Sequence, residues 1–208
     1  MHRLKQALTF MVLAVGVAAC GGTQGSVDSS QDATPSATEA KVRTGKNVTA
    51  HAKYLYHFTS VPEMAEQSDV IIGTVSAARD GRTSNPAENL RERRRILSVD
   101  VRHTLAGALG SNVDVETWGW RWIEGEWVEI HEAGVPWLEV GDKVLIGLTQ
   151  FEEAGLRGAS SAVSTYVFRD GRVAVPRDNR LAEPVQPLPR LLDGMTEAEV
   201  VEAFRTQQ

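Results

Sequence analysis

The sequence predicts a mainly β domain, a closed or partly open barrel of about five strands with an added hairpin, a short N-terminal helix and a C-terminal helix. Several segments of the 208-residue chain alternate apolar and polar side chains, which is the pattern of half-buried strands. Asp-Gly and Glu-Gly pairs lie between these segments and are typical of turns. Closing a sheet into a barrel removes its exposed edges, so a barrel suits a run of short strands.

The first predicted elements are a short helix and a strand. The residues SVPEMAEQ fit a helix in which Ser60 is the N-cap, Pro62 lies in the first turn and Glu63 completes a capping box. The run DVIIGTVSAA is rich in β-forming residues and is expected to end at the turn signal Asp80-Gly81.

A long polar loop and an alternating strand come next. The loop contains Asn85-Pro86 and four arginines: Arg91, Arg93, Arg94 and Arg95. In the strand ILSVDVRHTL the apolar face consists of Leu97, Val99 and Val101, and the polar face of Ser98, Asp100 and Arg102. The arginines are expected to be solvated where the loop enters this strand, or to meet anionic lipid or wall polymer.

Two hairpins and two further strands complete the β region. The segment NVDVET alternates, residues 118–130 predict a hairpin around Glu124-Gly125, and KVLIGLTQF is a more apolar strand entered through Gly141-Asp142. A second hairpin is predicted to turn at Asp170-Gly171.

The C-terminal part predicts a proline-rich strap and a helix. Residues 176–189 are expected to run extended over the surface. In the helix, Thr196 is the N-cap and Glu199 closes a capping box. The apolar face of this helix consists of Val200, Val201 and Phe204.

Cys20, the only cysteine, ends the apolar run VLAVGVAAC. The run is too short to cross a bilayer, and it follows a basic head with Arg3 and Lys5, as in a cleavable export signal. The segment VAAC resembles the bacterial lipobox. This resemblance implies that residues 1–19 are a signal peptide, that Cys20 is joined to diacylglycerol, and that the exported protein is anchored on the extracytoplasmic side of the cell membrane or of an outer membrane. The alternatives are an ordinary signal peptide with an incidental cysteine, or a poor membrane anchor.

The chain is expected to contain one domain. Residues 20–50 predict a lipidated cysteine and a flexible tether, because this segment is rich in small and polar residues and nearly free of large apolar ones. A flexible coil of about 30 residues spans roughly 30 Å. The remaining residues, 51–208, predict the folded domain.

Composition narrows the classes of partner. The chain has a formal net charge of −5, and no long basic stripe is present, so nucleic acid is not an expected partner. With its only cysteine joined to lipid, the exported chain has no disulfide, and its folding must depend on a hydrophobic core.

Three short motifs point to a known fold. Asp69 precedes a strand that contains Gly73-Thr74-Val75, a second strand enters a glycine turn at residues 105–110, and Gly141-Asp142 precedes a third strand. In this order the motifs resemble a family of bacterial lipoproteins with a netrin-like OB barrel, a fold also known from tissue inhibitors of metalloproteinases. The resemblance implies an OB-like barrel over residues 60–168. Those inhibitors reach the protease zinc through a cysteine at the barrel's own N-terminus, whereas Cys20 lies a tether's length away, so their mechanism does not transfer.

Catalytic motifs are absent from the sequence. It contains no G-x-S-x-G elbow, no H-E-x-x-H, no phosphate-binding G-x-x-x-x-G-K and no C-x-x-C. Four histidines outside the signal peptide have no ligand spacing: His51, His57, His103 and His131. We therefore predict no catalytic residue, no cofactor and no metal site. An acid/base pair formed by His131-Glu132 near Trp118 is the alternative.

Four tryptophans are the candidate binding surface: Trp118, Trp120, Trp122 and Trp127. The first three are spaced by two, and a two-residue turn would place Trp127 opposite Trp122. Alternation puts the row beside Asp114 and Glu116 on the outer face, as a platform for sugar, peptide or protein. The alternatives are that Gly119 marks a bulge that turns the row inward, or that the hairpin folds back and is covered. Aromatic side chains usually serve packing, which favours these alternatives.

The favoured hypothesis is a lipid-anchored, non-catalytic interaction module of the bacterial cell envelope. Its partners would be the membrane, through Cys20, and an unknown protein or glycan. Two alternatives remain open: an envelope hydrolase or transferase whose site is not visible in the sequence, and a protease inhibitor by analogy of fold.

Overall fold

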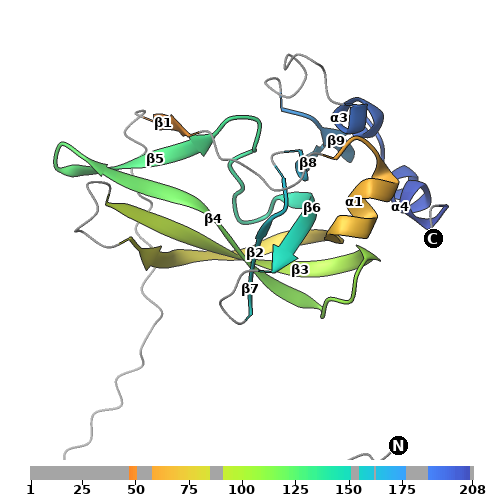
Figure 1. Ribbon diagram of the computed structural model, residues 1–208, viewed down its shortest axis with the longest axis horizontal. Coiled ribbons are helices and arrows are strands. Elements are labelled where there is room, and N and C mark those ends of the chain that lie inside the picture. Colours follow the sequence, from red (N-terminus) through yellow and green to blue (C-terminus); the bar gives the residue numbers. More distant parts are fainter. Residues whose placement is uncertain are drawn as a thin grey trace, which may run out of the picture. The chain divides into compact units, whose positions relative to one another are not determined.

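The computed structural model describes residues 47–50, 58–84, 91–150, 155–161, 163–176 and 187–206, all within the unit Val42–Gln208. In these ranges one sheet contains nine strands, and helices lie beside it (Figure 1). The strands are β1 (Asn47–Ala50), β2 (Asp69–Thr83), β3 (Glu92–Ala106), β4 (Asn112–Ile123), β5 (Glu126–Glu132), β6 (Lys143–Gln150), β7 (Leu156–Ala159), β8 (Thr165–Arg169) and β9 (Arg172–Ala174). The helices are α1 (Val61–Gln67), α3 (Pro187–Leu192) and α4 (Glu197–Arg205).

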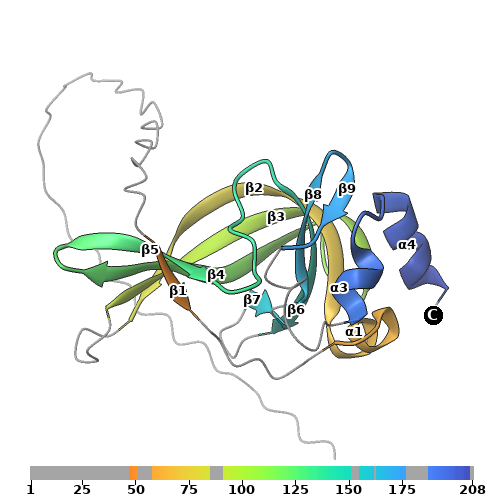
Figure 2. The same cartoon turned by 90° about the horizontal axis from the view of Figure 1, so that it is seen from above.

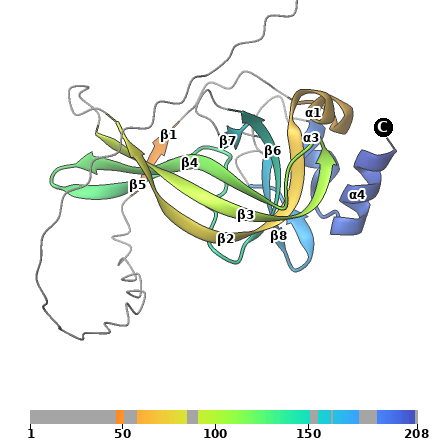
Figure 3. The ribbon, with the colours of Figure 1, turned by 90° about the horizontal axis from the view of Figure 1, so that it is seen from below.

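Five of these strands form a hydrogen-bonded ring. β2 pairs antiparallel with β3 and β6, and β3 pairs antiparallel with β4. β7 then pairs antiparallel with β6 and parallel with β4, so the hydrogen bonds run around β2, β3, β4, β7 and β6. β8 and β9 extend the sheet from β6, and β5 and β1 extend it from β4 (Figure 3).

Two buried apolar clusters stabilise this arrangement. The ring cluster consists mainly of alternate side chains of β2, β3, β4 and β6, among them Ile71, Leu97, Val99, Val113, Val115, Val144 and Ile146. The helix cluster packs all three described helices against the sheet, and it includes Met64, Tyr166, Leu192, Val200 and Phe204. The predicted alternation of β3 is confirmed, because Leu97 and Val99 are fully buried while Asp100 and Arg102 are exposed.

Both predicted helix starts are confirmed. At α4 the Thr196 hydroxyl accepts the Glu199 N–H, and the Glu199 carboxylate accepts the Thr196 N–H at 2.7 Å, which completes a capping box. At α1 the Ser60 hydroxyl accepts the Glu63 N–H at 3.4 Å. The Glu63 carboxylate, however, accepts from the Thr59 N–H at 2.7 Å, one residue before the predicted donor. This backbone bond and the Thr59 hydroxyl lower the pKa of Glu63.

Glu197, the first residue of α4, joins this helix to the ring. Its carboxylate accepts a hydrogen bond from the Lys143 ammonium of β6. It also lies 3.3 Å from Arg102 Nε and 3.1 Å from His103 Nε2, both on β3. Burial acts to raise the pKa of Glu197, but Lys143 and Arg102 outweigh it and hold that pKa below its usual value.

Two expectations for the region between β2 and β3 are wrong. β2 does not turn at Asp80-Gly81 but continues to Thr83, with a register shift against β3 between Asp80 and Thr83. A Cβ on Gly81 would lie 3.2 Å from the Cβ of Arg94, so the glycine permits close approach of the strands. The arginines at positions 93–95 are not loop residues, because β3 begins at Glu92.

β1, β7 and α3 are described elements that the sequence did not predict. β1 forms at the end of the segment predicted to be a tether, and Pro187–Leu192 is helical where an extended strap was predicted. The lipobox with Cys20, the rest of residues 1–46, and residues 177–186 lie outside the described residues. No helix in the described ranges is both long enough and apolar enough to span a bilayer.

We expect Val99→Asp to lower the free energy of unfolding by more than about 4 kcal/mol, because it places a carboxylate without a partner in the ring cluster. Asp100→Asn, at the neighbouring exposed position, is the matched control and should cost less than about 1 kcal/mol. Urea unfolding followed by circular dichroism measures both. Equal midpoints would contradict the assignment of the buried face of β3.

Candidate binding surface

The arm is our name for residues 91–95 and 118–132, which form the end of the sheet that lies away from the three helices (Figure 2). Four of the five tryptophans of the chain lie in the arm, and the fifth, Trp137, lies in the following loop. The arm also carries the arginines of the start of β3. It therefore brings together two groups of residues that the sequence offered as separate candidates.

A two-residue turn closes the β4–β5 hairpin, as predicted. Ile123 pairs with Glu126 and Trp122 pairs with Trp127, which leaves Glu124 and Gly125 as the turn. Their φ angles are +50° and +91°, the left-handed conformations that a tight hairpin turn of this length requires. The predicted turn at Asp170-Gly171 is confirmed in the same way, with φ angles of +52° and +75°.

A bulge at Gly119 interrupts β4 within the arm. Arg95 of β3 pairs with Thr117, but Arg93 pairs with Trp120, so β4 contains one extra residue between these two pairs. The extra residue brings the backbones so close that a Cβ on Gly119 would overlap the Arg93 carbonyl oxygen. Directly paired residues of antiparallel strands point to the same face, which puts Trp120 on the side of Arg93 and Arg95.

The bulge splits the predicted tryptophan row between the two faces of the sheet. Trp118 precedes the extra residue and lies under Arg94, on the face opposite to Arg93. Trp120 and Trp122 follow it, and Trp127 shares their face because it pairs with Trp122. The prediction of one row beside Asp114 and Glu116 is therefore wrong for all but Trp118, and the alternative of a bulge at Gly119 is confirmed.

Trp122 is the exposed tryptophan of the arm, and it contacts the half-buried Trp127. Their rings meet edge to face with centroids 5.3 Å apart, and Trp122 is 40% exposed. The Arg91 guanidinium lies 5.3 Å from the Trp122 ring and 5.2 Å from the Trp127 ring. Arg93 lies 4.3 Å from the Trp127 ring. Cation–π contacts at exposed sites contribute about 0.5–1 kcal/mol each, so the arginines hold the indoles in place outside the core.

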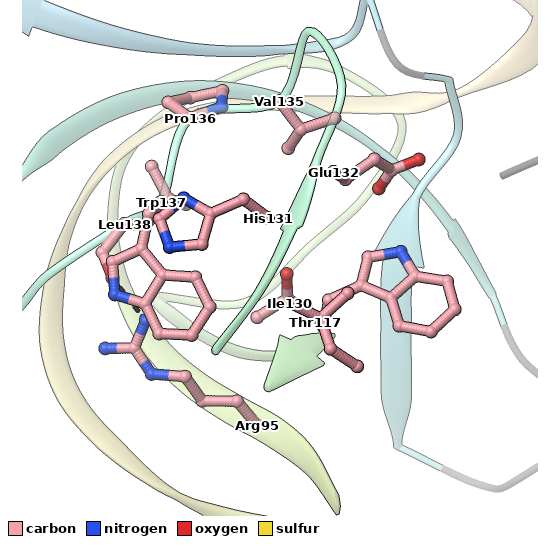
Figure 4. A pocket seen from close by; sticks show the side chains of 10 residues that line it. Arg95, Thr117, Ile130, His131, Glu132, Val135, Pro136, Trp137 and Leu138 are labelled. Atoms are coloured by element: carbon pink, nitrogen blue, oxygen red, sulfur yellow. Dashed lines mark hydrogen bonds between the residues drawn. The ribbon is translucent and has the colours of Figure 1, made fainter. Parts of the chain in front are cut away.

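Trp137 of the β5–β6 loop forms a second stack on the same face (Figure 4). His131 stacks on it at 5.1 Å with an interplanar angle of 12°, and Trp120 meets it edge-on at 6.1 Å. Arg95 is buried, lies 4.7 Å from the Trp137 ring, and donates a hydrogen bond of 2.5 Å to the Leu138 carbonyl oxygen. These contacts fix the loop over the ring, where Leu138 enters the ring cluster.

A buried carboxylate lies next to the arm, on the face of β4 opposite to Arg95. The Glu116 side chain is only 5% exposed, although it was predicted to point into solvent, and it accepts from Arg82 Nη2 at 3.1 Å. Its second oxygen is buried and has no hydrogen-bond partner within the described residues. Nearby, Arg94 lies 3.8 Å from the Trp118 ring. Burial lowers the pKa of Arg94, while Glu92 and Glu116 act in the opposite direction.

Most other arginines of this region form ion pairs with carboxylates. These pairs are Arg79–Asp114 at 2.7 Å, Arg93–Asp80 at 2.5 Å and Arg121–Glu92 at 2.5 Å. Arg91 differs from them. Its guanidinium contacts the two indole rings, its backbone carbonyl accepts from the Trp122 N–H at 2.8 Å, and none of the ion pairs among the described residues includes it.

Two cavities formed by described residues offer little enclosed space. A cavity beside His131 and Trp137 has a volume of about 10 Å³, about enough for one water molecule. His131 bonds to Glu129 at 3.0 Å rather than to Glu132, the predicted partner. A groove of about 350 Å³ between α1, β6 and β7 is open to solvent and contains the Asp69–Arg157 ion pair. No cluster of three or more metal-ligating side chains occurs in the described ranges.

The comparisons with known proteins identify no relative: no family model, no curated protein and no solved structure matches the chain. The candidate surface therefore rests on the residues of this chain alone. Sequence reasoning named Arg91, Arg93 and the tryptophans, but it did not pair them, and it omitted Trp137. The signal was present, because a β3–β4 hairpin that turns after Gly107 brings residues near 93 opposite residues near 119.

We expect Gly119→Ala to lower the free energy of unfolding by about 1–3 kcal/mol, because the added methyl group overlaps the Arg93 carbonyl. Gly110→Ala is the control, since the nearest atom to its added Cβ lies 4.0 Å away. Chemical denaturation gives both values. If the two variants were equally stable, the strands would not approach as closely at the bulge as described.

Proposed function

We propose that the protein is a lipid-anchored, non-catalytic binding module of a bacterial cell envelope, and that the arm face with Trp122 and Arg91 is its recognition surface. The observation that carries this proposal is the exposed stack of Trp122, Trp127 and Arg91 outside both apolar clusters. Exposed tryptophan and arginine side chains are enriched where proteins bind partners. A stack that adds to neither core is best explained by such a role.

The proposal includes an OB-like barrel of the netrin type. The ring order β2–β3–β4–β7–β6, closed by a parallel contact between β4 and β7, supports it. OB folds bind oligosaccharides and other polymers on the face of their second and third strands and on adjoining loops. In the ring these strands are β3 and β4, which both extend into the arm, while Arg91 directly precedes β3. This support is an analogy of fold.

The anchoring part of the proposal rests on Cys20 and the lipobox-like segment before it. An acylated cysteine would place the domain on the extracytoplasmic side of a membrane. Each buried methylene of an acyl chain contributes about 0.8 kcal/mol to membrane binding, so two or more chains give stable attachment. A module held in this way meets partners at a high effective concentration, which permits a small recognition surface.

Cys20→Ala should leave the precursor uncleaved and without acyl chains, because the thiol is the proposed site of lipid attachment. Metabolic labelling with a radioactive fatty acid and gel mobility measure the two effects. Ser30→Ala, a similarly small change in the predicted tether, is the control and should mature normally. Label incorporated into the Cys20→Ala protein would rule out anchoring at this cysteine.

Hydroxyl-radical footprinting should show that Trp122 is oxidised more slowly when the protein is in its own membranes than when it is purified in detergent. Trp122 is 40% exposed in the isolated domain, and a bound partner would cover it. Leu191, 49% exposed on α3, is the control and should oxidise equally in both samples. Unchanged oxidation of Trp122 would mean that the arm is not a recognition surface.

A further inference from the structure

Arg91 and Trp122 together have the chemistry of a membrane-interface contact. The Arg91 guanidinium carbon lies 5.3 Å from the Trp122 ring centroid and 5.2 Å from the Trp127 ring centroid, and no ion pair among the described residues includes it. A guanidinium is planar and binds the oxygens of a phosphate in the plane of its N–H groups, which stacking on an indole leaves open. Tryptophan is enriched at the headgroup level of membranes, where an apolar ring body and a polar N–H are both satisfied.

The first described strand of the chain belongs to the arm end of the sheet. β1 is the first described element, and it pairs in parallel with β5, which is one strand of the arm. Between Cys20 and Asn47 the sequence has 26 residues, and the tether predicted from their composition would span roughly 25–30 Å. The arm is therefore linked to the proposed lipid anchor by a shorter path than the helices at the other end of the sheet (Figure 2).

The charges of the arm favour a local contact over a broad electrostatic attraction. Arg93 is neutralised by Asp80, and Arg121 is neutralised by Glu92. Glu124 is exposed at the hairpin turn, so the tip carries both signs of charge. Arg91 has no ion pair among the described residues, and one arginine near an anionic lipid surface contributes about 1 kcal/mol, which is too little to recruit a free protein. It is enough for a tethered one, because the anchor makes the contact intramolecular.

We infer that the arm docks on the phospholipid surface that holds the anchor, with the Arg91 guanidinium on a headgroup phosphate and the Trp122 ring among the headgroups. This inference rests on the proposed function, because it requires the acylated Cys20. It names the partner of the recognition surface as the membrane itself. The domain then lies with its arm against the lipid and its helices away from it.

The test uses the full mature protein, purified with its acyl chains and inserted into vesicles of phosphatidylcholine and phosphatidylglycerol. Some of the phospholipid carries bromine on the acyl-chain carbons nearest the headgroup, which quenches tryptophans in contact with it. We expect strong quenching of the intrinsic fluorescence. Trp122→Phe should lose most of it, and Arg91→Gln should reduce it. Trp118→Phe is the matched control, since Trp118 lies on the opposite face of the arm, and it should not lower the quenched fraction.

The outcomes separate the inference from the proposed function. Mass spectrometry and flotation first establish whether the protein is acylated and bound to vesicles, and melting temperatures establish that each variant is folded. Protein without acyl chains would overturn the anchor and the docking together. Acylated, floating protein with weak quenching, or with quenching unchanged by Trp122→Phe, would overturn the docking alone. The recognition surface would then face a protein or glycan, as the broader proposal allows.

Discussion

The extra residue at Gly119 is the constraint that connects the ring to the arm, because β4 belongs to both. Before the bulge, Val113 and Val115 point into the ring cluster. Beyond the bulge, Trp120 pairs directly with Arg93 of β3 and lies on the same face of the sheet as these valines. Under strict alternation from Val115, that face would instead receive Gly119 and Arg121, and the tryptophans would point to the other side. Only glycine allows the approach to the Arg93 carbonyl that this change of register requires.

On the face of the arm that carries Trp122 and Trp127, the indole rings are covered by arginine side chains. The sheet there extends beyond the ring cluster, and indoles on its face would otherwise be left open to solvent. Arg91, Arg93 and Arg95 each lie over at least one ring, so that these side chains cover aromatic surface. The depth of burial changes along this series. Arg95 is buried and fixed to the Leu138 carbonyl, Arg93 is paired with Asp80 at an intermediate position, and Arg91 is exposed.

Local sequence signals predicted the elements whose conformation is decided locally. Thr196 with Glu199, the turn at Glu124-Gly125 and the alternation through Val99 depend on neighbours in the chain, and all three were read correctly. β7 was missed because LRGA has no useful periodicity, and its strand conformation depends on pairing with β4 and β6. Asp80-Gly81 gave a misleading turn signal, since pairing with β3 overrides the local preference. Strict alternation placed the tryptophan row wrongly, but Gly119 gave the signal of the bulge, and that alternative is confirmed by the register of β3 and β4.

The two ends of the sheet differ in the interactions that stabilise them. At the helix end, Val200 and Phe204 are fully buried and Glu197 joins α4 to β3 and β6, so substitutions there act on stability. At the arm, Trp122 and Arg91 contribute to neither apolar cluster, and their contacts are worth about 1 kcal/mol each. Substitutions of side chains at the tip of the arm should therefore change stability little, which suits the recognition surface proposed there. The ring and the helix cluster supply the rigid support that such a surface needs.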